Sequence, residues 1–199
     1  AGRTFHARTV VIMKPTWPTW LYDLCLVPEH DLPAGRRSRR IVPTCGALNR
    51  IPEELPAKEA KGLILLGGPS RTHGWAGDEL IPCVREIVAA GARLRWTAAD
   101  SRRTPAGFLA QLVQCVPGLQ PLPREQVSSE QWLRQLLAAE EIWVTADSVS
   151  MAFEAVTAGA RVGLLPAPVR DPGGGPARAL EALVSRGHAT LFAAWRLQG

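Results

Sequence analysis

The chain has 199 residues, a net charge of +5, 46% hydrophobic residues and 21% charged residues. This composition is typical of a folded globular protein, and the length allows one full domain with part of a second. No apolar run reaches the roughly 20 residues that a transmembrane helix needs, and the N-terminal stretch has no long apolar segment typical of a signal peptide.

The cysteines and histidines are dispersed along the chain, and no CxxC pair occurs among Cys25, Cys45, Cys83 and Cys115. A disulfide framework or a metal site would need regular or closer spacing. We therefore expect reduced thiols, a cytoplasmic location, and neither a metal nor another cofactor.

The first fifty residues predict three short strands, at 8–13, 22–27 and 41–43. A proline-containing connection follows over residues 46–60, and we place a domain boundary there. The sequence thus predicts a partial N-terminal domain over 1–50 and a complete domain over 51–199.

An arginine-rich loop, GRRSRR at residues 35–40, separates the second and third strands. Such a run can bind nucleic acid or an anionic membrane, but neither an aromatic platform nor a recognition helix flanks it. We expect a solvated loop and no nucleic-acid partner, with peripheral membrane contact through Arg36–Arg40 as an alternative.

From residue 62 onward, strands alternate with amphipathic helices, which predicts an α/β fold with a parallel, Rossmann-like sheet covered by helices on both faces. The expected helices cover 78–90, 104–116, 131–139, 148–158 and a segment after the GGGP at 173–176. The expected strands begin at residues 62, 92, 142, 161 and 189.

Three loops at the carboxyl ends of these strands carry polar residues, and ligands of open parallel sheets bind at that edge. The first loop contains Gly67, Gly68, Ser70 and Arg71. Glycines allow close backbone approach or positive φ, and the hydroxyl and guanidinium groups can bind phosphate. The loop matches neither a Walker motif nor a GxGxxG fingerprint.

The second loop places Ser101, Arg102 and Arg103 before Thr104, which we expect to begin a helix. One of the two hydroxyl residues is expected to serve as an ordinary N-cap. Paired arginines at a helix N-terminus oppose the helix dipole, an arrangement that favours an anion between them.

The third loop runs from a buried strand into a helix that either Asp147 or Ser148 caps, with Ser150 in its first turn. The amide groups of such a turn form an anion site. Glu154 lies one turn after Ser150 and is either an exposed helical residue or a ligand for ribose hydroxyls. Together the three loops predict a nucleoside diphosphate site.

Five motifs, VPEHD, TCGAL, LLGGPS, SRRTP and VTADSVSMAFEA, make residues 9–190 resemble the ELM-one family of bacterial proteins and plant mitochondrial-fission factors. That family is similar to glycosyltransferases of the GT-B fold, in which two Rossmann-like domains face each other across a cleft. The resemblance implies a nucleotide-sugar ligand, with the donor bound by the C-terminal domain.

The resemblance also implies roles for the individual residues. The backbone of Ser148, Val149, Ser150 and Met151 would face the pyrophosphate, and Glu154 would bind the ribose. Gly67, Gly68 and Ser70 would face the phosphates from the first loop, where Arg102 or Arg103 would neutralise them.

Family members carry about half a domain more ahead of the first strand, so this chain resembles a fragment, a truncated gene product, or a protein that completes its first domain with another chain. Because a sheet of three short strands with an open edge is a poor independent fold, we expect a homo-oligomer or other contacts that cover it.

Transferases of this type need no metal, but they need a general base for the acceptor hydroxyl. Glu29, His30 and Asp31 follow a strand, and a histidine beside two carboxylates is suited to that role. The alternative is a loop in which these side chains bond locally.

Three functions remain open at this point. The first is a metal-independent glycosyltransferase that uses a nucleotide sugar. The second is a non-catalytic adaptor of the mitochondrial-fission type, acting through protein or membrane-surface contacts. The third is a nucleotide-sugar epimerase, for which the additional carboxylates of such a site are not visible in the sequence.

Overall fold

The structure is a computed structural model that describes residues 7–32 and 38–198. It divides into two compact units, residues 1–50 and 51–199. Across the described ranges, no helix combines the length and the apolar character needed to cross a bilayer.

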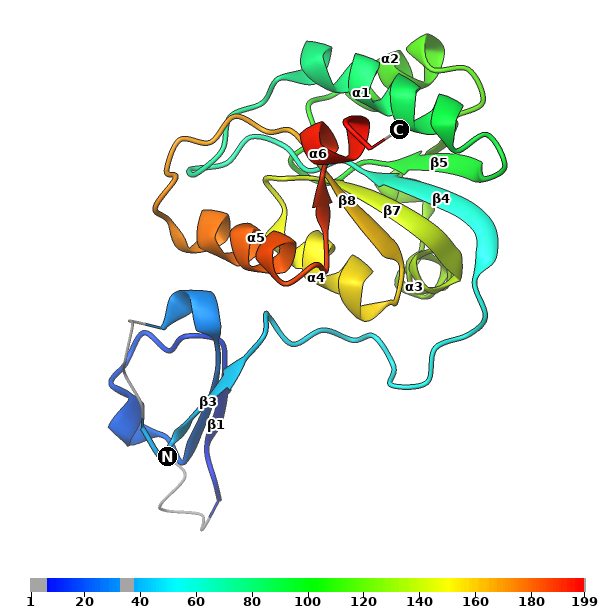
Figure 1. Cartoon of the computed structure of the whole chain (residues 1–199). Coiled ribbons are helices and arrows are strands. Elements are labelled where there is room, and N and C mark those ends of the chain that lie inside the picture. The colour runs from blue at the N-terminus through cyan, green and yellow to red at the C-terminus, as the bar shows by residue number, and fades with distance from the viewer. Residues whose placement is uncertain (1–6, 33–37, 199) are drawn as a thin grey trace. The chain divides into compact units, whose positions relative to one another are not determined.

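The first unit is a three-stranded parallel sheet in the order β1-β2-β3 (Figure 1). Its elements are β1 (Val10–Ile12), η2 (Thr19–Leu21), β2 (Leu24–Pro28), η3 (Glu29–Asp31) and β3 (Ile41–Thr44). Among the described residues of this unit, Cys25 and Val27 are the buried hydrophobic side chains. This small sheet therefore has little core of its own.

The second unit is a six-stranded, fully parallel sheet in the order β6-β5-β4-β7-β8-β9. Its strands are β4 (Glu59–Leu65), β5 (Arg95–Ala99), β6 (Gln120–Leu122), β7 (Ala139–Thr145), β8 (Arg161–Leu165) and β9 (Thr190–Leu191). Chain order reverses between β4 and β7, which pair side by side in the middle of the sheet. This reversal is the topological switch point at which doubly wound sheets bind ligands.

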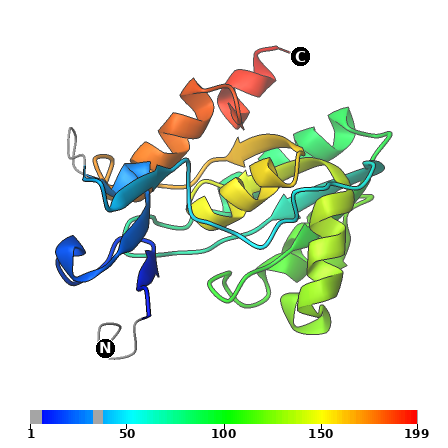
Figure 2. The same cartoon turned by 90° about the horizontal axis from the view of Figure 1, so that it is seen from below.

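Helices cover both faces of this sheet, as the alternating sequence pattern predicts. They are α1 (Gly77–Ala90), α2 (Phe108–Cys115), α3 (Ser129–Ala138), α4 (Val149–Thr157), α5 (Gly175–Ser185) and α6 (Phe192–Arg196), with the short η4 (Arg124–Gln126) between β6 and α3. Figure 1 shows α1, α2 and α6 on one face, and Figure 2 looks onto the face that α3, α4 and α5 cover. Each face has its own hydrophobic core.

Local sequence explains how the helices are placed. In α1 the side chains that the 3.6-residue period predicts to point inward are buried, namely Leu80, Ile81, Val84, Ile87 and Val88. Helix α3 begins with a capping box, in which Ser128 and Gln131 each accept a hydrogen bond from the other's backbone N–H.

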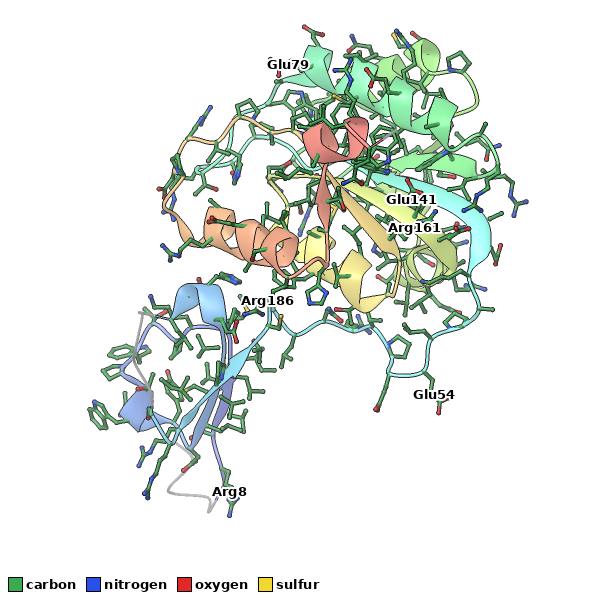
Figure 3. All side chains as sticks on the ribbon, viewed as in Figure 1. Arg8, Glu54, Glu79, Glu141, Arg161 and Arg186 are labelled. Atoms are coloured by element: carbon green, nitrogen blue, oxygen red, sulfur yellow. The ribbon has the colours of Figure 1, made fainter. Side chains whose placement is uncertain are left out.

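An ion-pair network lies toward the amino ends of the strands, opposite the edge that carries the three polar loops. Arg161 contacts Glu140 and Glu141, each with a shortest separation of 3.0 Å, and Arg93 also binds Glu140 (Figure 3). The Arg93 guanidinium lowers the pKa of the Glu140 carboxyl. These charges belong to the scaffold because they lie away from the switch point.

Candidate functional site

The loops after β4 and β7 are joined at the switch point by two hydrogen bonds from glycine amides. The N–H of Gly67 donates to Oγ1 of Thr145 at 2.7 Å, and the N–H of Gly68 donates to Oδ2 of Asp147 at 2.9 Å. Thr145 is the last residue of β7 and is buried. Its role was not predicted, since a threonine at a strand end gives no signal in the sequence.

Asp147 also holds the loop after β5. Nη1 of Arg103 lies 2.8 Å from Oδ2 of Asp147 and donates to the carbonyl oxygen of Gly68 at 2.6 Å. The Asp147 side chain is fully buried, and its Oδ1 has no hydrogen-bond partner within the described part of the chain. The guanidinium of Arg103 is therefore paired with the carboxylate of Asp147, whereas Arg102 is exposed and makes no such pair among the residues that the structure describes.

The hydroxyl groups of Ser101 and Thr104 join the loop after β5 to the loop after β4. Oγ1 of Thr104 donates to the carbonyl oxygen of Leu66 or Gly67, at 2.9 and 2.6 Å, and Oγ of Ser101 donates to that of Gly67 at 3.1 Å. The expectation that a helix starts at Thr104 was wrong. Helix α2 starts at Phe108, because the Thr104 hydroxyl bonds to the neighbouring loop and residues 105–107 form a turn.

Close packing explains both glycines of the first loop. A Cβ at Gly68 would lie 1.9 Å from the carbonyl oxygen of Arg103, and one at Gly67 would lie 2.1 Å from Oδ2 of Asp147. Neither glycine has a positive φ. Of the two reasons that the sequence offered for these glycines, close approach is therefore the one that applies.

Ser70 and Arg71, both in the loop after β4, differ in the contacts that their side chains make. Oγ of Ser70 accepts hydrogen bonds from the N–H groups of Thr72 and His73, at 3.3 and 3.0 Å, and so shapes its own loop. Arg71 is exposed and has no ion-pair partner in the regions that the structure describes. Further along, the N–H of Gly74 donates to the carbonyl oxygen of Pro168 at 2.7 Å, which joins this loop to the one after β8.

Helix α4 starts at the same edge with an open first turn. Ser148 is at the N-cap position, but its side chain makes no capping hydrogen bond, and Asp147 is turned away toward Gly68 and Arg103. The first hydrogen bond of the helix runs from the N–H of Ala152 to the carbonyl oxygen of Ser148. The preceding amides of Val149, Ser150 and Met151 have no acceptor within the helix.

Glu154 lies in the second turn of α4 and is half-buried. Burial raises the pKa of its carboxyl, and no cation or hydrogen-bond donor of the described chain contacts the side chain. An acidic group held this way, beside free amides, can accept hydrogen bonds from ligand hydroxyls. The exposed-residue alternative for Glu154 does not hold.

The structure places the remaining candidates in the first unit. Glu29, His30 and Asp31 form η3, in which Nε2 of His30 lies 3.9 Å from Oδ1 of Asp31. The base role of these residues stays a prediction. Of the arginine-rich loop, Arg36 and Arg37 lie outside the described residues, while Arg40 donates to the carbonyl oxygen of Trp20.

Comparison with protein families gives a match that spans nearly the whole chain. The model described as Mitochondrial fission ELM1 matches residues 2–198. The chain belongs to this family. The match confirms the ELM1 resemblance that the five motifs indicated. The curated proteins contain no sequence that matches this ELM1 chain.

Solved structures similar to this ELM1 chain include MurG of Acinetobacter baumannii, with a TM-score of 0.52, 13% identity, and coverage of 96% of this chain and 54% of that one. The glycotransferase of kitacinnamycin gives a TM-score of 0.49 and 19% identity, over 86% of this chain and 42% of that one. The ELM1 chain thus spans about half the length of these structures. The MurG likeness confirms the α/β, GT-B-like fold.

Proposed function

We propose that this GT-B-like protein binds a nucleoside diphosphate sugar at the carboxyl edge of the β4–β7 switch point. The observation that carries the proposal is the open first turn of α4, whose free amides begin directly after Asp147 and Ser148. A helix N-terminus of this kind favours a phosphate group.

The surrounding residues fit the same ligand. Arg71 and Arg102 are exposed in the first two loops and leave positive charge for a diphosphate. Glu154, one turn beyond the open amides, supplies a carboxylate for ribose hydroxyls. Arg103 is held by Asp147, so we assign it to positioning the first loop rather than to neutralising the ligand.

We infer further that the bound nucleotide sugar serves a metal-independent glycosyl transfer. The chain would contribute charge stabilisation of the leaving diphosphate and orientation of the donor. The base for the acceptor hydroxyl is assigned to His30, with Glu29 and Asp31 beside it, since no other histidine of the described chain follows a strand among carboxylates.

The test is thermal unfolding with UDP, GDP, CDP and ADP and their sugars. Saturation at about 100 times Kd adds roughly 2.7 kcal/mol, which raises Tm by about 5–10 °C for a chain of this size. We expect Tm to rise with the nucleotides of one nucleobase. This rise should be absent in Glu154→Ala and retained in the control Glu181→Ala, which removes an exposed acid of α5. A folded protein with no shift for any nucleotide would overturn the proposal.

A second candidate function is that of a non-catalytic adaptor. The observation that favours it is the apolar surface of the first unit, where Trp17 is 69% and Trp20 66% exposed. Large exposed aromatic side chains mark protein or membrane-surface contacts. Binding to anionic vesicles that falls with salt, without nucleotide affinity, would identify the adaptor.

A further inference from the structure

A cavity lies in the second unit, between the start of α1 and the turn before α2. Its volume is about 440 Å³, and Trp75, Asp78, Glu79, Phe108 and Gln111 are among its lining residues. None of the residues assigned to the nucleotide lines it. The cavity is therefore a separate feature from the proposed nucleotide site.

One wall of this cavity is formed by two aromatic side chains that lie against Gly77. Trp75 and Phe108 meet edge to face, with ring centroids 5.0 Å apart and planes at 85°. A Cβ at Gly77 would lie 2.7 Å from Phe108 and 2.9 Å from Nε1 of Trp75. The first residue of α1 is thus a glycine because the two rings occupy the space that a side chain would need.

The polar groups of the cavity are acidic or neutral. Asp78 and Glu79 are exposed carboxylates with no ion-pair partner among residues 7–32 and 38–198, and Glu79 projects from the start of α1 in Figure 3. No lysine, arginine or histidine lines the cavity. It therefore repels phosphate and attracts a cation, which the neighbouring aromatic rings also favour.

We propose that this cavity binds an ammonium or guanidinium group carried on a short alkyl chain. The alkyl part packs against Trp75, the carboxylates of Asp78 and Glu79 at the start of α1 supply the negative charge that attracts the cation, and the Gln111 amide adds a hydrogen bond. Such a group reaches the cavity either as a free amine or as a side chain of a basic peptide. The inference does not depend on nucleotide binding.

The test follows the indole N–H signal of Trp75 in two-dimensional NMR spectra of the full chain. Trp75→Phe identifies this signal by removing it. Agmatine, a peptide with one arginine between glycines, and glucose are then titrated at about 150 mM salt, where weak surface attraction is screened. We expect a saturable shift with both cations and none with glucose, because glucose carries no charge.

The double variant Asp78→Asn, Glu79→Gln decides the role of the carboxylates. We expect its affinity for agmatine to fall by about tenfold or more, because both charges facing the cation are lost. Glu181→Gln, which removes an exposed acid of α5, should bind as the unchanged chain does. The proposal is overturned if the double variant, with an otherwise unchanged spectrum, binds equally well, or if glucose alone shifts the signal.

Discussion

Gly68 is the residue at which the candidate site depends most directly on the absence of a side chain. A Cβ there meets the backbone of Arg103, which cannot move aside as a flexible side chain could. We expect Gly68→Ala to lower the free energy of unfolding by about 3 kcal/mol, measured by urea denaturation.

Gly173 provides the matched control for this substitution. It lies in the loop before α5, where no atom surrounds an added Cβ within 4 Å and φ is not positive. Gly173→Ala should change stability by less than about 1 kcal/mol, and in the stabilising direction. Equal losses in the two variants would show that close approach at Gly68 is not the cause.

The half-buried carboxyl of Glu154 should make the free energy of unfolding depend on pH. Its pKa is raised by burial in the folded chain, so its contribution to stability is present at low pH and lost as pH rises through the folded pKa. We therefore expect Glu154→Gln to be more stable than the unchanged chain at pH 7. The difference should shrink as the pH falls toward the unfolded value of about 4.3.

Unfolding curves at several pH values between 4 and 8 test this expectation. Glu181→Gln, which removes an exposed acid of α5, is the matched control in these measurements. If Glu154→Gln gained stability but lost nucleotide affinity, the role of Glu154 would lie in ligand binding and not in folding. Lower stability of Glu154→Gln at pH 7 would contradict the burial argument.

At the scale of elements, Lys58 joins the C-terminal ends of two helices. Its Nζ donates to the carbonyl oxygens of Leu137 at 2.9 Å, in the last turn of α3, and of Ala158, the C-cap of α4. A cation at a helix C-terminus interacts favourably with the dipole and satisfies free carbonyls. Burial lowers the pKa of this lysine, which reflects its partial removal from water.

We expect Lys58→Met to lower the free energy of unfolding by about 1–2 kcal/mol, because two carbonyl groups lose a charged donor. Hydrogen exchange should rise in the last turns of α3 and α4. The control is Lys61→Met, which removes a partly exposed ion pair with Glu59 and should cost less than about 0.5 kcal/mol. If both variants lost a similar free energy of unfolding, the removal of a positive charge would explain the loss, and the carbonyl contacts of Lys58 would not.

The elements that the sequence predicted are those with strong periodicity. Helix α1, predicted over 78–90, covers Gly77–Ala90, since its apolar spacing has a single interpretation. Strand β4 begins at Glu59, ahead of the predicted start at residue 62, because its first residues are polar or exposed and give no apolar signal. Strand β6 was missed because its three residues include Pro121, which is disfavoured in strands. The last strand, predicted to begin at residue 189, is confirmed as β9 over Thr190–Leu191, but the short helix α6 that begins at Phe192 was not predicted.

The three loops were predicted as a group, but their internal contacts were not. Parallel topology brings the ends of β4, β5 and β7 to one edge, and this follows from the order of elements. That Asp147 would turn toward Arg103 and Gly68, and leave the α4 amides open, depends on contacts between residues 35 to 79 positions apart. Sequence spacing carries no information about such contacts.

At the scale of the whole molecule, the two units differ in how much apolar surface they bury. The second unit has a hydrophobic core on each face of its sheet. In the first unit the outer strand β1 leaves Val10 54% and Ile12 57% exposed. A sheet of three short strands with so few buried side chains supplies little stability by itself.

This difference predicts unequal protection of backbone amides from hydrogen exchange, measured by mass spectrometry over a range of protein concentrations. We expect β4 and β7 to exchange slowly at every concentration, because both lie in the centre of the larger sheet. Strand β2 should exchange much faster in dilute protein, since Cys25, Val27 and Pro28 are its buried residues and its unit has little core. Protection of β2 that increases with concentration would support a homo-oligomer that covers the first sheet, whereas strong protection in dilute protein would show that this unit is stable alone.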